Sequence, residues 1–236
     1  MEYFIIILVL IIFIVILKIG FNIKIKDIKK IKELSTDEEN LNLIKNFPDN
    51  KQICKDILEM LNNKDVEIEE NTDEKSQTSL YLVMNNKILI ANINNVFTRI
   101  QTIAHECIHS IQNKALLKFN FIFSNIANIY FLLICLLSIF KVTNKEIANI
   151  LLIVLILIKF ASYAIRSFLE TDAMTRAEYL SQEYIQRVNI VSKEDEQKIL
   201  TKYKELNKVG IKLYNFVLAC KAIFVVIIYC VILMFI

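Results

Sequence analysis

The chain has 236 residues and a formal net charge of +3, and 55% of its residues are hydrophobic while 22% are charged. A soluble domain is rarely this apolar, so the mixture predicts membrane spans that alternate with well-solvated segments. Only 2 glycines and 1 proline interrupt the sequence, and we therefore expect long helices. The small net charge, without a basic stripe interleaved with aromatic residues, argues against a nucleic acid partner.

Four apolar runs are candidates for membrane-spanning helices, at residues 3–20, 121–140, 147–165 and 211–236. Each approaches or exceeds the roughly 20 residues that a helix needs to cross the hydrocarbon layer. The first run resembles a signal peptide in length, but it has no basic region before it and no small-x-small cleavage site after it. We therefore interpret it as an uncleaved anchor.

The charges around the first run predict the orientation of the chain. Glu2 alone precedes the run, and the lysines that follow it closely are Lys18, Lys24, Lys26, Lys29, Lys30 and Lys32. Because positive residues stay on the cytoplasmic side, this pattern predicts an outside N-terminus and a cytoplasmic segment at 21–118.

The remaining runs complete the predicted topology of a multi-pass protein in the lipid bilayer. After the anchor (1–20) and the first cytoplasmic segment (21–118) come a transmembrane hairpin (119–165), a second cytoplasmic segment (166–210) and a last helix (211–236) that ends outside. The predicted fold is mainly α, with four transmembrane helices and a small cytoplasmic α+β element. No CxxC motif is present, and we expect no disulfide framework among cytoplasmic and membrane-buried cysteines.

The first half of the segment 21–118 predicts two helices. Ser35 and Thr36 begin a match to a capping box, which predicts a helix that stops at Pro48. Residues 50–63 have apolar side chains at helical spacing and predict a second helix, with one apolar face made of Ile53, Ile57, Leu58 and Leu61.

The second half of this segment predicts a hairpin followed by a helix. An acidic, solvated loop is expected at 69–78, and residues 79–92 form two β-rich runs around an Asn85-Asn86 turn. Thr98 and Gln101 make another capping-box match, which predicts the start of the next helix.

That helix contains the stretch AHECIHSIQ, at residues 104–112, with the only two histidines of the chain. His105 and His109 are four residues apart, so both imidazoles project from one helix face and can bind one metal ion. Glu106 stands beside them, where it could accept a proton from a metal-bound water. Two unrelated histidines are the ordinary alternative, but this spacing together with the adjacent glutamate favours a metal site.

A hydrolytic zinc site has three protein ligands and an open position for water. No third histidine exists, and Gln112 and Ala115 stand where an HExxHxxGxxH pattern would continue. The third ligand must therefore be a carboxylate or a cysteine. The segment FLETDAMTRAEYLSQEYI follows the third apolar run on the same predicted side of the membrane, and Glu170 in it is a candidate.

These motifs together resemble the membrane-bound neutral zinc metallopeptidase family of bacteria, which is similar to the HtpX and CAAX-prenyl-protease class of gluzincins. His105, Glu106, His109 and Gln112 match its H-E-x-G-H-A-x-Q motif, and the segment LETDAMTRA matches its E-F-D-A-S-R-R-A motif at Glu170, Asp172, Ala173, Arg176 and Ala177. The resemblance covers roughly residues 75–236. Ile108 departs from the pattern, because it stands where the family has glycine and adds bulk near the metal.

The resemblance implies Glu170 as the third zinc ligand, while Glu178 is the competing candidate in the loosely similar Glu-Tyr-Leu. Asp172 is expected to orient a histidine N–H group, and Gln112 lies on the metal face or packs against the hairpin. For the oxyanion that forms during hydrolysis, Arg176 is the first candidate donor and Tyr179 the second.

The expected function is that of a zinc metalloendopeptidase in a bacterial cell membrane, which cleaves peptides or membrane proteins at the cytoplasmic face. Zinc would lower the pKa of a bound water, Glu106 would accept its proton, and an extended substrate could add to the edge of the hairpin 79–92. Two alternatives stay open: a catalytically idle membrane scaffold or chaperone, and a metal-dependent hydrolase of a non-peptide bond. The sequence leaves the substrate, the oligomeric state, any regulator and the choice among divalent metals open.

Overall fold

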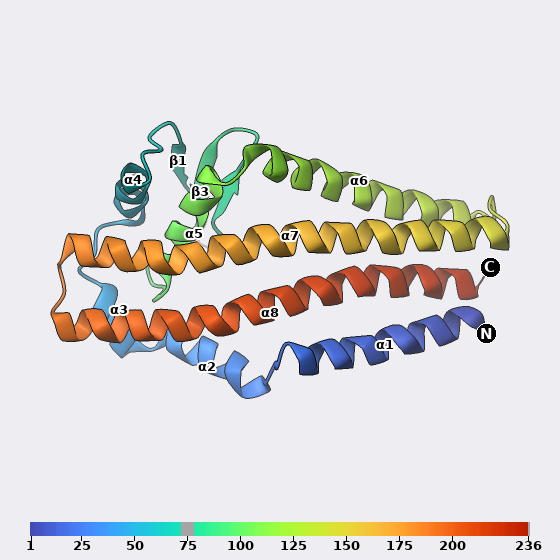
Figure 1. The fold of residues 1–236 in the computed structure, drawn as a ribbon, viewed down its shortest axis with the longest axis horizontal. Helices are drawn as coiled ribbons and strands as arrows, with labels where there is room; N and C mark the ends of the chain where they lie inside the picture. The colour runs from blue at the N-terminus through green and yellow to red at the C-terminus, as the bar shows by residue number, and fades with distance from the viewer. Residues whose placement is uncertain (72–77, 236) are drawn as a thin grey trace. The chain divides into compact units, whose positions relative to one another are not determined.

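The computed structural model describes residues 1–71 and 78–235 and is mainly helical, with 76% helix (Figure 1). The short helices are α2 (Ile25–Thr36), α3 (Glu38–Ile44), α4 (Asn50–Met60) and α5 (Arg99–Ile111). The longer ones are α1 (Glu2–Gly20), α6 (Lys114–Ile139), α7 (Lys145–Val188) and α8 (Lys193–Met234). Three strands are present in the described part of the chain: β1 (Glu67–Glu70), β2 (Leu80–Leu82) and β3 (Lys87–Ile90).

The chain divides into two compact units, and α6, α7 and α8 each contribute to both. The first, which we call the apolar unit, consists of residues 1–23, 119–169 and 212–236. The second, which we call the polar unit, consists of residues 24–118 and 170–211. Each unit has a hydrophobic core of its own.

Four helices are long and apolar enough to cross a membrane, namely α1, α6, α7 and α8. Their apolar side chains are mostly exposed: α1 buries none of its residues, although its mean hydropathy reaches 3.1. Lipid is the solvent in which such a surface is stable. The prediction of four apolar helices is thus confirmed, while the sidedness of the membrane stays a prediction.

Polar side chains inside the apolar unit hydrogen-bond between helices. The Tyr229 hydroxyl lies 3.1 Å from the Ser138 hydroxyl, both fully buried, and joins α8 to α6. The Arg166 Nε donates to the Tyr214 hydroxyl at 3.2 Å and joins α7 to α8. Because an unpaired polar group is costly in an apolar medium, such pairs fix the mutual register of the helices.

Four helices of the described chain end in a left-handed residue that is not glycine, in a sequence with only 2 glycines. After α1, for example, Asn22 has φ 52°, its N–H bonds the Ile19 carbonyl, and the Ile23 N–H bonds the Lys18 carbonyl. This pair of bonds is a Schellman motif, and α4 and α6 end in the same way at Asn62 and Lys141. The motif stops each helix sharply and turns the chain away from the helix axis.

The helices of the polar unit differ from the prediction mainly at their first residues. The helix expected between Ser35 and Pro48 is present as α3, but its predicted start is wrong, because α2 continues through Thr36 and α3 begins only after Asp37, whose backbone is extended. Thr98 does precede α5, but its side chain accepts no capping bond, since its backbone (φ −82°, ψ 11°) is not in the extended region that a capping side chain requires. Helix α4 is confirmed, and Asp49 caps it by accepting the Gln52 N–H at 2.7 Å.

The predicted hairpin is confirmed, and a third strand extends it to a sheet of order β1-β3-β2. Strand β2 pairs antiparallel with β3, and Asn86 in the turn has φ 51°. Strand β1 pairs parallel with β3 and replaces the start of the acidic loop predicted at 69–78, while residues 72–77 of that loop lie outside the described residues. Lys87 of β3 explains how the acidic β1 is tolerated, since it forms ion pairs with Glu67 at 2.9 Å and Glu69 at 2.7 Å.

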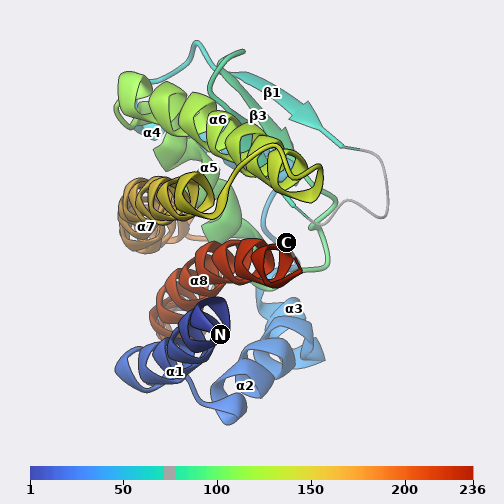
Figure 2. The same cartoon turned by 90° about the vertical axis from the view of Figure 1, so that its right-hand side faces the viewer.

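Helix α5 is the central element of the polar unit and contacts α4, β2 and β3 (Figure 2). Its buried face includes the apolar residues Ile100, Ile103, Ala104 and Ile108. The Tyr203 hydroxyl on α8 donates to the Phe97 carbonyl at 2.7 Å just before the helix begins. One face of α5 is therefore held in the core, and the orientation of its other face is fixed.

Arg99, the first residue of α5, is buried and donates hydrogen bonds to the connection between α3 and α4. Its guanidinium is 4% exposed and donates to the carbonyls of Ile44, Phe47 and Pro48 and to Asn50 Oδ1, at 2.8 to 3.1 Å. One arginine thus satisfies three main-chain acceptors of a segment that has no regular structure.

Replacing Arg99 by alanine should lower the free energy of unfolding by about 3 kcal/mol, because several buried acceptors lose their donor. For a chain of this size the unfolding temperature should fall by roughly 6 to 12 °C. A thiol-reactive fluorogenic dye in detergent would measure it, because Cys54 and Cys107 are buried in the polar unit until it unfolds. The exposed Lys51→Ala serves as the control. Equal unfolding temperatures for the two variants would show that the Arg99 hydrogen bonds do not stabilise the polar unit.

Candidate metal site

Helix α5 presents the two histidines side by side on the face that is turned away from the core. Their rings meet edge to face with centroids 4.6 Å apart, and His105 Nε2 lies 3.0 Å from His109 Nε2. This geometry follows directly from the four-residue spacing, which places the side chains one helical turn apart.

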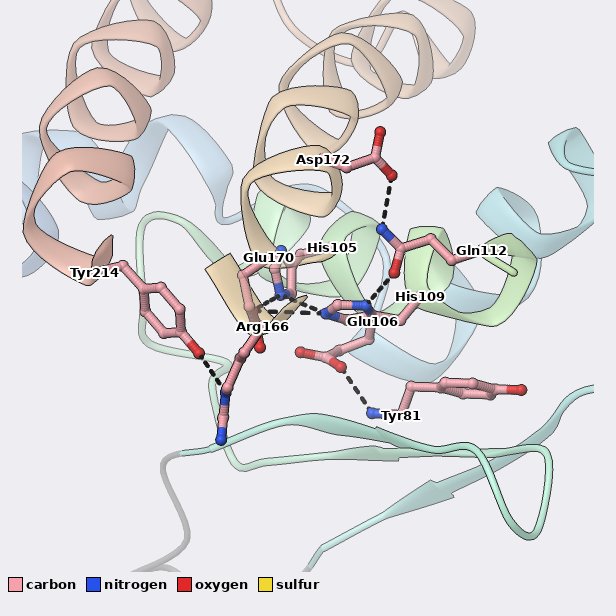
Figure 3. Close-up of polar contacts among 9 residues, drawn as sticks. All are labelled: Tyr81, His105, Glu106, His109, Gln112, Arg166, Glu170, Asp172 and Tyr214. Atoms are coloured by element: carbon pink, nitrogen blue, oxygen red, sulfur yellow. Dashed lines mark hydrogen bonds and ion pairs between the residues drawn. The ribbon is translucent and has the colours of Figure 1, made fainter. Parts of the chain in front are cut away.

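Glu170, on α7, brings a carboxylate to the same point. Its Oε2 lies 3.4 Å from His105 Nε2 and 3.7 Å from His109 Nε2, and all three side chains are less than one-fifth exposed (Figure 3). These three groups could hold a metal ion. A tetrahedral zinc ion with bonds of ~2.0–2.1 Å places its ligand atoms roughly 3.3 Å apart, which is close to the separations found here.

Protonation in this cluster reflects the proximity of the three groups. Burial acts to raise the pKa of Glu170, but its pairing with His105 and His109 outweighs burial and holds the pKa well below its ordinary value. Burial acts to lower the pKa of His109, but the contact with Glu170 and the charges of Glu106 and Glu170 hold it above its ordinary value. The cluster therefore favours a negative carboxylate with a cation close to it.

Glu106 lies beneath the histidines, between the ring of His109 and the sheet (Figure 3). It is only 6% exposed, and its Oε2 accepts the main-chain N–H of Tyr81, on β2, at 2.7 Å. Burial raises the pKa of Glu106, while the histidines and the Tyr81 N–H act in the opposite direction. A carboxylate in this position can accept a proton from a group held by the cluster.

A polar chain extends from His109 to α7 through Gln112, the residue that follows the last turn of α5. Gln112 Oε1 lies 2.8 Å from His109 Nδ1, and Gln112 Nε2 donates to Asp172 Oδ2 at 2.6 Å (Figure 3). The Arg176 Nη1 lies 3.6 Å from the same oxygen of Asp172. The chain thus runs from the histidine through an amide to a carboxylate and an arginine.

This chain fixes the tautomer of His109. A carboxylate only accepts, so Gln112 must present its N–H₂ group to Asp172 and its oxygen to the histidine. His109 therefore donates from Nδ1 to Gln112 Oε1, and Nε2 is the ring nitrogen that faces His105 and Glu170. Asp172 was expected to contact a histidine directly, whereas the structure places Gln112 between them.

The other candidates from the sequence lie apart from the cluster. Glu178 accepts the Asn207 side-chain N–H at 2.8 Å, and no described contact joins it to the histidines. Arg176 is exposed and paired with Asp172. Tyr179 is 67% exposed, about 13 Å along the axis of α7 from Glu170, and lines a separate pocket with residues of α8. The structure thus supplies no contact that supports Arg176 or Tyr179 as the oxyanion donor.

The main-chain N–H of Tyr81 is the member of the site that the sequence did not predict. Its side chain has no part in the contact with Glu106, so no residue type could have revealed it. The only signal was indirect, because the hairpin precedes the histidine helix closely enough to pack beside it.

Disrupting the chain behind His109 should weaken metal binding without removing a ligand. Gln112→Leu deletes the acceptor for the His109 Nδ1 proton, and the affinity for zinc should fall about 10- to 100-fold. Competition with a chromogenic chelator would measure this in detergent-purified protein. Glu178→Gln, a polar change elsewhere on α7, is the control and should bind zinc like the unmodified protein. An unchanged affinity in Gln112→Leu would refute the role of the hydrogen bonds between His109, Gln112 and Asp172.

No family model, no curated protein and no solved structure matches this chain. The resemblance to zinc metallopeptidases consequently stays a prediction from the motifs, and the function has to be argued from the geometry of the cluster.

Proposed function

We propose that the protein is a membrane-anchored zinc metalloendopeptidase. The observation that carries this proposal is the convergence of His105, His109 and Glu170, with donor atoms 3.0 to 3.7 Å apart, directly above the buried carboxylate of Glu106. Metal binding alone would require only the two histidines and Glu170. It gives no reason to bury the carboxylate of Glu106 beside them.

The donor set supports zinc as the resident ion. Two imidazole nitrogens and one carboxylate oxygen suit Zn²⁺, whereas Mg²⁺ and Ca²⁺ prefer oxygen ligands throughout. Three protein ligands leave one tetrahedral position for water, which is the arrangement of hydrolytic rather than structural zinc sites. The bound ion would supply a water of lowered pKa and polarise the carbonyl under attack.

Glu106 would move the proton in this reaction. Its carboxylate is held by the Tyr81 N–H, so the side chain cannot rotate away from the cluster, and its raised pKa brings it closer to the range useful for accepting a proton and returning it to the leaving amine. The His109 imidazole is held in one orientation by Gln112 and Asp172.

Strand β2 supports a peptide as the substrate. It lies at the edge of the sheet, and the register Tyr81↔Ile88 leaves the Tyr81 N–H pointing outward, where it meets Glu106. Because the Tyr81 N–H is donated to Glu106, an extended peptide that adds to this edge would pair with the remaining main-chain groups, and it would then lie beside the cluster. The proposed substrates are unfolded or membrane-linked segments, and the lysines that follow α1 place the site on the cytoplasmic face of the bilayer in this proposal.

Metal content is the first test. The detergent-purified chain should contain about one zinc ion. His109→Ala and Glu170→Ala should lose the ion, because each removes one of three ligands, whereas Glu178→Ala should keep it. Elemental analysis by mass spectrometry would decide, and a chain that takes up no zinc under loading conditions would exclude the peptidase and favour a membrane scaffold.

Glu106→Gln separates catalysis from binding. The variant should retain zinc, because Glu106 is not a ligand, but its turnover of a quenched fluorescent peptide library should fall about 100- to 10,000-fold with the loss of the proton acceptor. Lys114→Gln, a polar change at the start of α6, provides the active control. If the original chain binds zinc and cleaves no peptide, a non-peptide bond becomes the better substrate class.

A further inference from the structure

Helix α2 presents an apolar pair to solvent that the fold of the polar unit does not use. Ile25 is 77% exposed and Ile28 is 43% exposed, one turn apart on the same helix face. Five large apolar side chains are exposed in the described part of the polar unit, and α2 contributes two of them. A soluble surface seldom places two such residues together without a partner.

The opposite face of α2 packs against the polar unit, and these contacts fix the orientation of the face that contains Ile25 and Ile28. Ile31 and Leu34 pack against the core of the polar unit. Lys30 forms an ion pair with Glu205 on α8 at 2.8 Å, and the Asn40 side chain donates to the Leu34 carbonyl at 2.9 Å. The helix therefore cannot roll to bury Ile25 and Ile28 against its own unit.

Basic side chains surround the apolar pair. Lys24, Lys26 and Lys29 are all exposed, and among the described ion pairs Lys29 contacts Glu33 at 3.8 Å. Asp27 is the one acidic residue in the first turn of α2, so the basic residues outnumber it there. Two isoleucines flanked by lysines match a surface that is anionic above and apolar just below, which describes the headgroup layer of an acidic bilayer.

The chain itself keeps this helix near a membrane. The apolar helix α1 ends at Gly20, Asn22 turns the chain away from the axis, and residues 21–24 are the only link to α2. Four residues reach at most about 14 Å. A span in α1 therefore confines the first turn of α2 to the interfacial layer of the same bilayer.

We propose that α2 is an interfacial helix that binds anionic phospholipid. Ile25 and Ile28 insert at the boundary between headgroups and acyl chains, and Lys24, Lys26 and Lys29 bind the phosphate-bearing headgroups. The inference does not depend on the metal site or on peptidase activity.

The absence of tryptophan from the chain allows a direct test, because a single introduced tryptophan is a unique fluorophore. Ile25→Trp is placed in the full-length protein in nanodiscs of phosphatidylcholine with phosphatidylglycerol, and brominated acyl chains serve as quenchers. We expect blue-shifted emission and strong quenching, most of all by bromine at shallow acyl positions. The matched control is Tyr179→Trp, also exposed but about 20 Å beyond residue 165 along α7, which should emit as in water and escape quenching.

The charge requirement is tested in the same discs. Lys24→Gln, Lys26→Gln and Lys29→Gln, combined in the Ile25→Trp chain, should reduce the quenching, and so should 1 M salt, which shortens the screening length to about 3 Å. Discs of phosphatidylcholine alone should give the same reduction. The proposal is overturned if Ile25→Trp emits like the control, or if quenching is equal with and without anionic lipid. Protection of the buried Cys54 and Cys107 from a thiol-reactive dye verifies that the polar unit is folded in these variants.

Discussion

Three side chains that could share one metal ion meet at one point in the polar unit, and they join α5 to the part of α7 that begins at Glu170. The Nε2 atoms of His105 and His109 and the Oε2 atom of Glu170 lie within 3.7 Å of one another. Electron pairs so close repel unless a cation is shared among them. A proton can serve only one of the contacts at a time, whereas a divalent metal could satisfy all three.

The sequence predicted those parts of the site that depend on local spacing. His105, Glu106 and His109 belong to one helix, so the 3.6-residue period sufficed to place them. Glu170 follows His109 by 61 residues, so no local spacing could place it, and it was a candidate only through the predicted topology and the motif resemblance. The role of Gln112 needed coordinates, because which of His109, Asp172 or the hairpin an amide contacts depends on how α5 and α7 approach each other.

The fold shows the same division between local and long-range effects. Apolar periodicity identified the long helices and α4, because burial or lipid contact repeats along the sequence. The capping boxes failed for two reasons: Ser35 and Thr36 still belong to α2, and the backbone of Thr98 is not extended. Strand β1 was missed because three of its four residues are glutamates, which are stable in a strand only through the ion pairs that Lys87 provides from β3.

The bond between Glu106 and the edge strand has a consequence for how this site can change over generations. Its donor is the main-chain N–H of residue 81, which every amino acid except proline carries. The side chain there can drift while the restraint on the glutamate persists, so neither a comparison of sequences nor an alanine scan would single out the position. The group that restrains Glu106 is thus retained under every substitution at residue 81 except that by proline.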